Sequence, residues 1–102
     1  MKFLAMDHGV DVDQKKVDTY LKEDVTRVWE LYVEGTIREF YQRGDNPFAV
    51  LILECANLDQ AKDKLSTIPF VQHGITAFDV IPLEPFVGLN IFFKLEMADV
   101  RS

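Results

Sequence analysis

The chain has 102 residues, and 48% of them are apolar, which is enough for one domain with one hydrophobic core. Its 17 acidic and 11 basic residues give a formal net charge of -6, which argues against binding a nucleic-acid backbone through clustered Lys and Arg. The single cysteine, Cys55, excludes an internal disulfide and a cysteine-rich zinc site. Only two histidines are available as further ligands, so we expect no metal site.

The apolar N-terminal run "MKFLAM" is interrupted at Asp7 and lacks the longer apolar stretch of a signal peptide. No segment approaches the roughly 20 apolar residues that a membrane-spanning helix needs. We therefore expect a soluble, cytoplasmic protein that binds neither membrane nor nucleic acid.

The first half of the chain predicts a strand, a long helix and a hairpin. Residues 2 to 7 form an apolar run of strand length, which "HGVDVD" ends. From about residue 14 to 34, apolar residues recur every three or four positions, and Gly35 follows where a helix C-cap glycine belongs. Residues 37 to 54 then predict two strands joined by the turn "RGDNP".

The second half predicts one more helix and one more strand. Asn57 caps the helix and Gln60 completes a capping box, while Pro69 ends the apolar pattern. Residues 75 to 83 form the fourth strand. The order is β-α-β-β-α-β, which is typical of the ferredoxin-like α+β fold, with a four-stranded antiparallel sheet and both helices on one face.

The C-terminal part of the chain is longer than this fold needs. We expect residues 1 to 86 to form the domain and residues 87 to 102 to form an extension. This extension is strongly apolar and must be buried in this chain or in a neighbour. We expect it to pack on a neighbouring subunit, where it can add a strand to an exposed sheet edge.

The predicted sheet is apolar on both faces, although two helices cover only one of them. The runs "FLAM", "FAVLIL" and "FDVIPL" show no polar alternation, unlike strands with one face in water. We therefore expect the same face of a second copy to cover the far side in a two-fold dimer. Strict alternation places Arg38 on the helix side of the sheet. It puts eight residues of the hairpin on the far face: Ile37, Glu39, Tyr41, Arg43, Phe48, Val50, Ile52 and Glu54.

Four segments of residues 1 to 86 resemble the dimeric α+β-barrel superfamily, and within it the muconolactone isomerase-like and YCII-related small proteins. They are "KFLAMD", "ELYVEGTIREFYQR", "ILECANLDQAKDKLSTIPF" and "FDVIPLEPF". The resemblance implies a dimer built on the ferredoxin-like fold. Muconolactone isomerases shift a double bond in a lactone by proton transfer without a cofactor, so the resemblance also implies that chemistry.

Asp24 falls inside the apolar stripe of the first helix, where a lone buried carboxylate costs several kcal/mol. One interpretation is an ion pair with Arg38. The other is a general base with a raised pKa, and the resemblance supports it, because muconolactone isomerases carry an acid at the matching helix position. An arginine after the same glycine also belongs to that family pattern, so Arg38 is the expected anchor for a substrate carboxylate.

Other candidates lie at strand ends and on the far face. Tyr41 is a candidate proton donor, with Arg43 and Glu54 as candidate binding residues, and the alternative for all three is a set of contacts between subunits. His8 with Asp79 is the counterpart of the His and Asp that YCII-related proteins are thought to use. The alternative is a surface histidine.

These residues support three hypotheses about function. The first is a cofactor-free oligomeric protein that binds an organic acid or a lactone-like molecule and acts as a proton-transfer isomerase, with Asp24 or His8 as the base. The second is a non-catalytic ligand-binding or structural protein. The third is a cofactor-free monooxygenase of the same superfamily.

Overall fold

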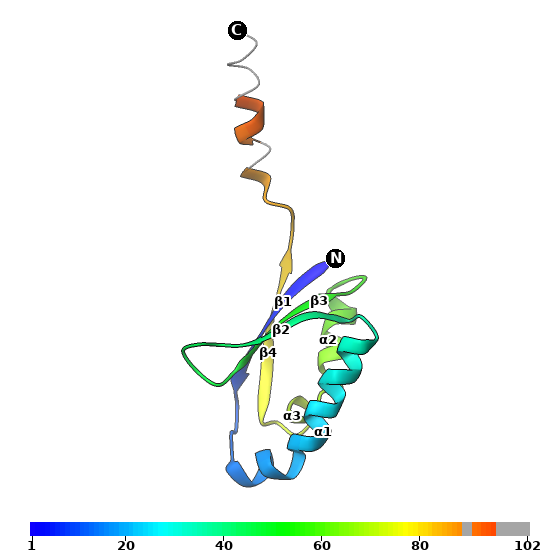
Figure 1. Ribbon diagram of the computed structural model, residues 1–102, viewed down its shortest axis with the longest axis vertical. Helices are drawn as coiled ribbons and strands as arrows, with labels where there is room; N and C mark the ends of the chain where they lie inside the picture. The colour runs from blue at the N-terminus through cyan, green and yellow to red at the C-terminus, as the bar shows by residue number, and fades with distance from the viewer. Residues whose placement is uncertain (89–90, 96–102) are drawn as a thin grey trace.

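The computed structural model describes residues 1–88 and 91–95 (Figure 1). It contains β1 (Lys2–Gly9), α1 (Gln14–Val33), β2 (Ile37–Gln42), β3 (Ala49–Glu54), α2 (Leu58–Leu65), α3 (Pro69–Gln72) and β4 (Thr76–Leu83). The strands form one antiparallel sheet in the order β2-β3-β1-β4, and the helices lie together on one face of it (Figure 1). The predicted ferredoxin-like α+β fold is confirmed. No helix among the described residues is long and apolar enough to cross a membrane.

The predicted caps at Gly35, Asn57 and Gln60 are present, and Asp13 adds a cap that was not predicted. The Asp13 side chain accepts a hydrogen bond from the backbone N–H of Lys15 at the start of α1. Gly35, just beyond the end of α1, has a φ of 91°, a left-handed conformation that glycine adopts at low cost. At α2, the Asn57 side chain accepts from the backbone N–H of Gln60 at 2.8 Å, and the Gln60 side chain accepts from that of Ala56 at 2.6 Å.

Pro69 begins a helix instead of ending one. The α2 helix stops at Leu65, and Pro69 occupies the first turn of the separate four-residue helix α3. Proline suits this position because its missing N–H would have no partner there in any case. The prediction that the second helix runs as far as Pro69 is therefore wrong, and the break between the two helices places α3 against α1 and β4.

A β-bulge in β2 changes the predicted faces of the hairpin. Ile37 pairs with Leu53 but Glu39 pairs with Ile52, so Arg38 is an extra residue on its strand. Ile37 consequently faces the helices and is only 1% exposed, whereas strict alternation had placed it on the far face. Arg38 is exposed and, as the bulge residue, no longer follows the strict alternation that had placed it on the helix side.

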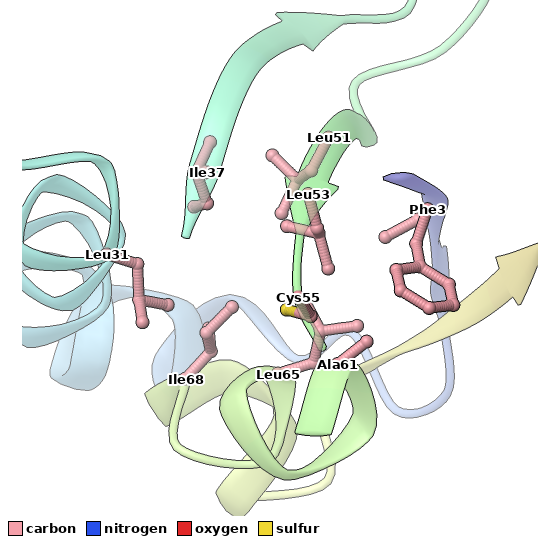
Figure 2. Packing of buried hydrophobic residues seen from close by; sticks show 10 residues of the cluster. Phe3, Leu31, Ile37, Leu51, Leu53, Cys55, Ala61, Leu65 and Ile68 are labelled. Atoms are coloured by element: carbon pink, nitrogen blue, oxygen red, sulfur yellow. The ribbon is translucent and has the colours of Figure 1, made fainter. Parts of the chain in front are cut away.

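The hydrophobic core lies between the sheet and the helices. Figure 2 shows its side chains converging from β1 and β3 onto α1, α2 and the segment that leads to α3. Its most deeply buried members include Phe3 and Leu53, which face each other across β1 and β3. The cluster consists of Phe3, Ala5, Leu31, Ile37, Leu51, Leu53, Cys55, Ala61, Leu65 and Ile68.

The opposite face of the sheet, here called the open face, is apolar too. The strand register places six apolar side chains on it, and no helix covers them. Ile81 and Leu83 are 46% and 39% exposed in the single chain. These six are Leu4, Met6, Val50, Ile52, Ile81 and Leu83. The predicted second apolar face therefore exists.

The chain beyond β4 runs away from both layers, and the orange turn at residues 91–95 stands clear of the domain (Figure 1). Val87, Gly88 and residues 91–95 have helical backbone. Six apolar side chains of this segment are each more than half exposed: Phe86, Val87, Ile91, Phe92, Phe93 and Leu95. Two parts of the predicted extension (residues 87 to 102), namely residues 89–90 and 96–102, lie outside the described residues.

Candidate functional site

A cavity of about 230 Å³ lies between the sheet and helices α1 and α3. Most of its wall is apolar, and the polar side chains among its lining residues include two carboxylates, Asp7 and Asp24. Small-molecule sites usually combine an apolar wall with a few polar groups in this way. The main apolar lining residues are Val28, Phe40, Leu51, Ile68, Phe70 and Phe78.

Asp7 is the most unusual residue of this cavity. It lies on β1 opposite Phe78 of β4, and its Oδ1 atom is buried without a hydrogen-bond partner. The pKa of Asp7 is raised from its ordinary 3.8 to about 6, chiefly because burial disfavours the charged form and to a smaller extent because of the nearby charge of Asp24. Hydrogen bonding with Thr76 and with the backbone of Ala49 lowers the pKa, but less than burial raises it.

Asp7 was not among the residues that the sequence singled out, although the strand pattern contained the signal. Side chains alternate along β1, and Phe3 and Ala5 are both fully buried against the helices. Two residues further on, Asp7 must point to the same face. A carboxylate that continues a buried stripe is a candidate for a shifted pKa, as Asp24 is on α1.

Asp24 holds the start of α3. Its Oδ1 accepts a hydrogen bond from the backbone N–H of Phe70 at 2.9 Å. The N-cap residue of α3 is Ile68, whose side chain cannot accept a hydrogen bond, so Asp24 supplies the capping oxygen from a different element. Burial raises the pKa of Asp24, and the hydrogen bond from Phe70 opposes this rise. The predicted ion pair with Arg38 is not formed, because the bulge turns Arg38 toward solvent.

The remaining candidates of the hairpin do not form one cluster. Tyr41 borders the cavity, but its hydroxyl donates to Glu39 Oε1 at 2.9 Å, which raises the pKa of Tyr41. Arg43 donates two hydrogen bonds to Asp45 in the turn, at 2.8 and 2.7 Å. Glu54 accepts from the ammonium group of Met1 at 3.1 Å, at the end of β3.

His8 and Asp79 lie side by side on β1 and β4, with His8 Nε2 3.6 Å from Asp79 Oδ1. The register directs both toward the open face, away from the cavity and from Asp7. The two residues therefore form a second, separate acid–base pair. Within residues 1–88 and 91–95, no three His, Cys, Asp or Glu side chains come together as metal ligands.

The fold is that of known small enzymes. A crystal structure of muconolactone isomerase superposes with a TM-score of 0.69 at 18% identity, covering 84% of this chain and 91% of the other. This chain shares the muconolactone isomerase fold. A 5-chloro-2-hydroxyhydroquinone dehydrochlorinase from Burkholderia phenoliruptrix, solved with 2,5-dihydroxybenzoquinone, superposes with a TM-score of 0.61 at 15% identity and covers 84% of this chain and 96% of its own. No protein-family model and no curated protein sequence matches the chain.

Asp7→Asn is expected to stabilise the protein near neutral pH. Folding raises the pKa of Asp7, so the folded chain binds more protons than the unfolded chain between about pH 4 and 6. The stability that neutral Asp7 contributes is therefore present below this pH range and is lost as the pH rises through it. The shift sets an upper limit of about 3 kcal/mol, and solvent screening reduces it to about 1 to 2 kcal/mol. Urea unfolding at pH 4 and pH 7.5 measures the effect, and a variant that is destabilised equally at both pH values would contradict it.

Substitutions of Asp24 separate its capping role from its charge. Asp24→Asn keeps an oxygen that accepts from Phe70, so we expect little loss of stability. Asp24→Ala leaves a partly buried N–H unpaired and is expected to cost about 1 to 2 kcal/mol. Thermal unfolding of both variants at pH 7 tests this order, and equal losses would show that the carboxylate charge is what matters.

Proposed function

We propose that the cavity binds a small lactone-like ring and that Asp7 transfers a proton on it, as in a cofactor-free isomerase. The observation that carries the proposal is the half-buried Asp7 carboxylate on the cavity wall, whose buried Oδ1 has no hydrogen-bond partner and whose pKa is raised to about 6. A general base works best when its pKa lies near the working pH, and an ordinary aspartate is too weakly basic for this role. The shared fold with muconolactone isomerase supports the same chemistry.

The proposed step keeps all atoms and electrons within the substrate. The Asp7 carboxylate removes a proton from the carbon next to the lactone carbonyl, and the electron pair delocalises onto the carbonyl oxygen as a dienolate. The same carboxyl group then returns the proton to the γ-carbon, so the double bond moves from the β,γ to the α,β position. Asp24 adds a second carboxyl group at the cavity wall, and its hydrogen bond from Phe70 keeps α3 in place beside the substrate.

The charge of the cavity limits which molecules enter it. No basic residue of the described chain lines its wall, while two carboxylates do. A buried carboxylate on the substrate would therefore face repulsion without a partner. We infer that the uncharged ring enters the cavity and that any carboxylate of the ligand stays at its mouth. Binding of an organic acid through Arg38 has less support, since Arg38 lies on the bulge and outside the cavity.

The isomerase proposal can be tested with an uncharged lactone. α-Angelica lactone isomerises to its conjugated form by the proposed proton transfer, and ultraviolet absorbance follows the reaction. The protein is expected to accelerate it, and Asp7→Asn to lower the rate by about 100-fold or more. The rate should rise with pH through about 6, as Asp7 loses its proton.

Glu23→Gln is the matched control, because it removes an exposed carboxylate next to Asp24 without touching the cavity. Full activity in Asp7→Asn would refute the role of Asp7. If His8→Gln removed the activity instead, the reaction would belong to the His8–Asp79 pair on the open face. Lactone binding without any isomerisation would identify a binding protein.

We also propose that a second copy covers the open face in a two-fold dimer, as the apolar strands predict. Six apolar side chains there have no cover within the described chain, and self-complementary contact of one flat patch is the simplest way to bury them. Ile52→Lys introduces a charge near the middle of this face, where each copy would meet the other. Sedimentation is expected to show a smaller assembly for this variant, while Val10→Lys, in an exposed loop, leaves the mass unchanged. A wild-type mass of 11.8 kDa at all concentrations would refute the dimer.

A further inference from the structure

Helix α1 carries a second apolar stripe that the sheet does not cover. Val25, Trp29 and Val33 follow one another at intervals of four residues and are 58%, 58% and 66% exposed. Tyr32 lies on the same side of the helix, and its ring contacts both Trp29, at 5.5 Å between centroids, and Phe40 of β2, at 5.1 Å. These five residues are here called the aromatic face. Soluble chains rarely leave such a continuous aromatic and aliphatic patch in water.

The same chain has an apolar segment that lacks a surface to pack on. From Phe86 to Leu95, the described apolar side chains are between 53% and 74% exposed, and none of them belongs to the core cluster. Residues 91–95 have helical backbone, and the rings of Phe92 and Phe93 touch edge to face at 5.8 Å. This segment, residues 86–95 without the undescribed 89–90, is here called the tail. A helix with so much exposed apolar surface is typical of one that docks on a partner.

The sheet order separates the tail from the aromatic face of its own chain. The aromatic face lies at the β2 edge of the sheet, because α1 packs next to β2 and Tyr32 of α1 contacts Phe40 of β2. The tail leaves from β4, which is the opposite edge of the order β2-β3-β1-β4, and continues away from the domain (Figure 1). Each surface is therefore presented outward, at a different end of the molecule, which is the arrangement of a head-to-tail contact between copies.

We propose that the tail of one copy docks on the aromatic face of a second copy. A helix packs well against another helix by fitting its ridges of side chains into the partner's grooves, so α1 suits the tail better than the flat open face of the sheet does. Phe40 belongs both to the aromatic face and to the lining of the cavity. The docked tail then lies next to a residue of the second copy's cavity wall.

The only tryptophan of the chain, Trp29, reports directly on this contact. In the full-length protein, we expect Trp29 emission to be shifted to shorter wavelength and shielded from iodide at micromolar concentrations, and to become exposed on dilution as the assembly dissociates. Phe92→Ser combined with Phe93→Ser is expected to expose Trp29 several-fold more to iodide and to lower the mass in sedimentation. Lys94→Ser, in the same turn of the tail, is the matched control and should change neither.

A second variant tests the other side of the contact without altering the tail. Val25→Ser combined with Val33→Ser is expected to lower the mass of the assembly, and far-ultraviolet circular dichroism verifies that the helices persist. Val10→Ser, with a similarly exposed valine in a loop, is its control and should leave the mass unchanged.

Three results would overturn the proposal. The first is an exposed Trp29 in the wild-type protein at all concentrations. The second is a shielded Trp29 that is insensitive to dilution in a monomer, because the tail would then fold onto its own chain. The third is unchanged shielding and mass in both double variants. Ile52→Lys distinguishes the tail contact from the sheet dimer, because Trp29 should stay shielded in this variant. The fluorescence measurement needs no substrate, so its outcome is independent of the isomerase proposal.

Discussion

A single layer of helices covers only one face of a sheet whose two central strands are apolar on both faces. Most features of this molecule follow from that constraint. On the helix side, β1 and β3 bury Phe3, Ala5, Leu51 and Leu53 in the core. On the other side, the same strands present Leu4, Met6, Val50 and Ile52 without any cover from the described chain. Burying an aliphatic side chain is worth about 1.5 to 3 kcal/mol, so two layers are an incomplete solution for this sequence. This uncovered apolar surface is the reason for the proposed association.

The same burial creates the chemistry of the cavity. The stripe of β1 that begins with Phe3 and Ala5 ends on a carboxylate, and the apolar wall around it disfavours its charged form. The neighbouring carboxylate of Asp24 differs in that it accepts a hydrogen bond from the backbone N–H of Phe70 and so caps the short helix α3. Two aspartates in one cavity therefore have different surroundings, one with a free oxygen and one tied to a backbone N–H. Such a difference allows one carboxyl group to exchange protons while the other holds the architecture.

The proposed association and the proposed chemistry share one residue. Phe40 belongs both to the cavity lining and to the aromatic face. A neighbour that covers this residue also limits the access of water to Asp7, which would keep its pKa high. The two proposed contacts use different surfaces, since the open face pairs with itself while the tail and the aromatic face are complementary to each other. A chain with one contact of each kind can form an assembly larger than a dimer.

The local features were determined by the sequence alone: the strands, the long helix, the caps at Asn57 and Gly35, and the excess of apolar residues on the sheet and in the tail. Each of these depends on residues close together in the chain, through periodicity, capping and turn chemistry. The bulge at Arg38 was decided by pairing with β3, and it turned Ile37 into the core. Likewise, the capping of α3 by Asp24 joins residues that are 46 positions apart, and the raised pKa of Asp7 depends on walls supplied by other elements. Register and desolvation are properties of strands and helices packed together, which is why only the tertiary structure decided them.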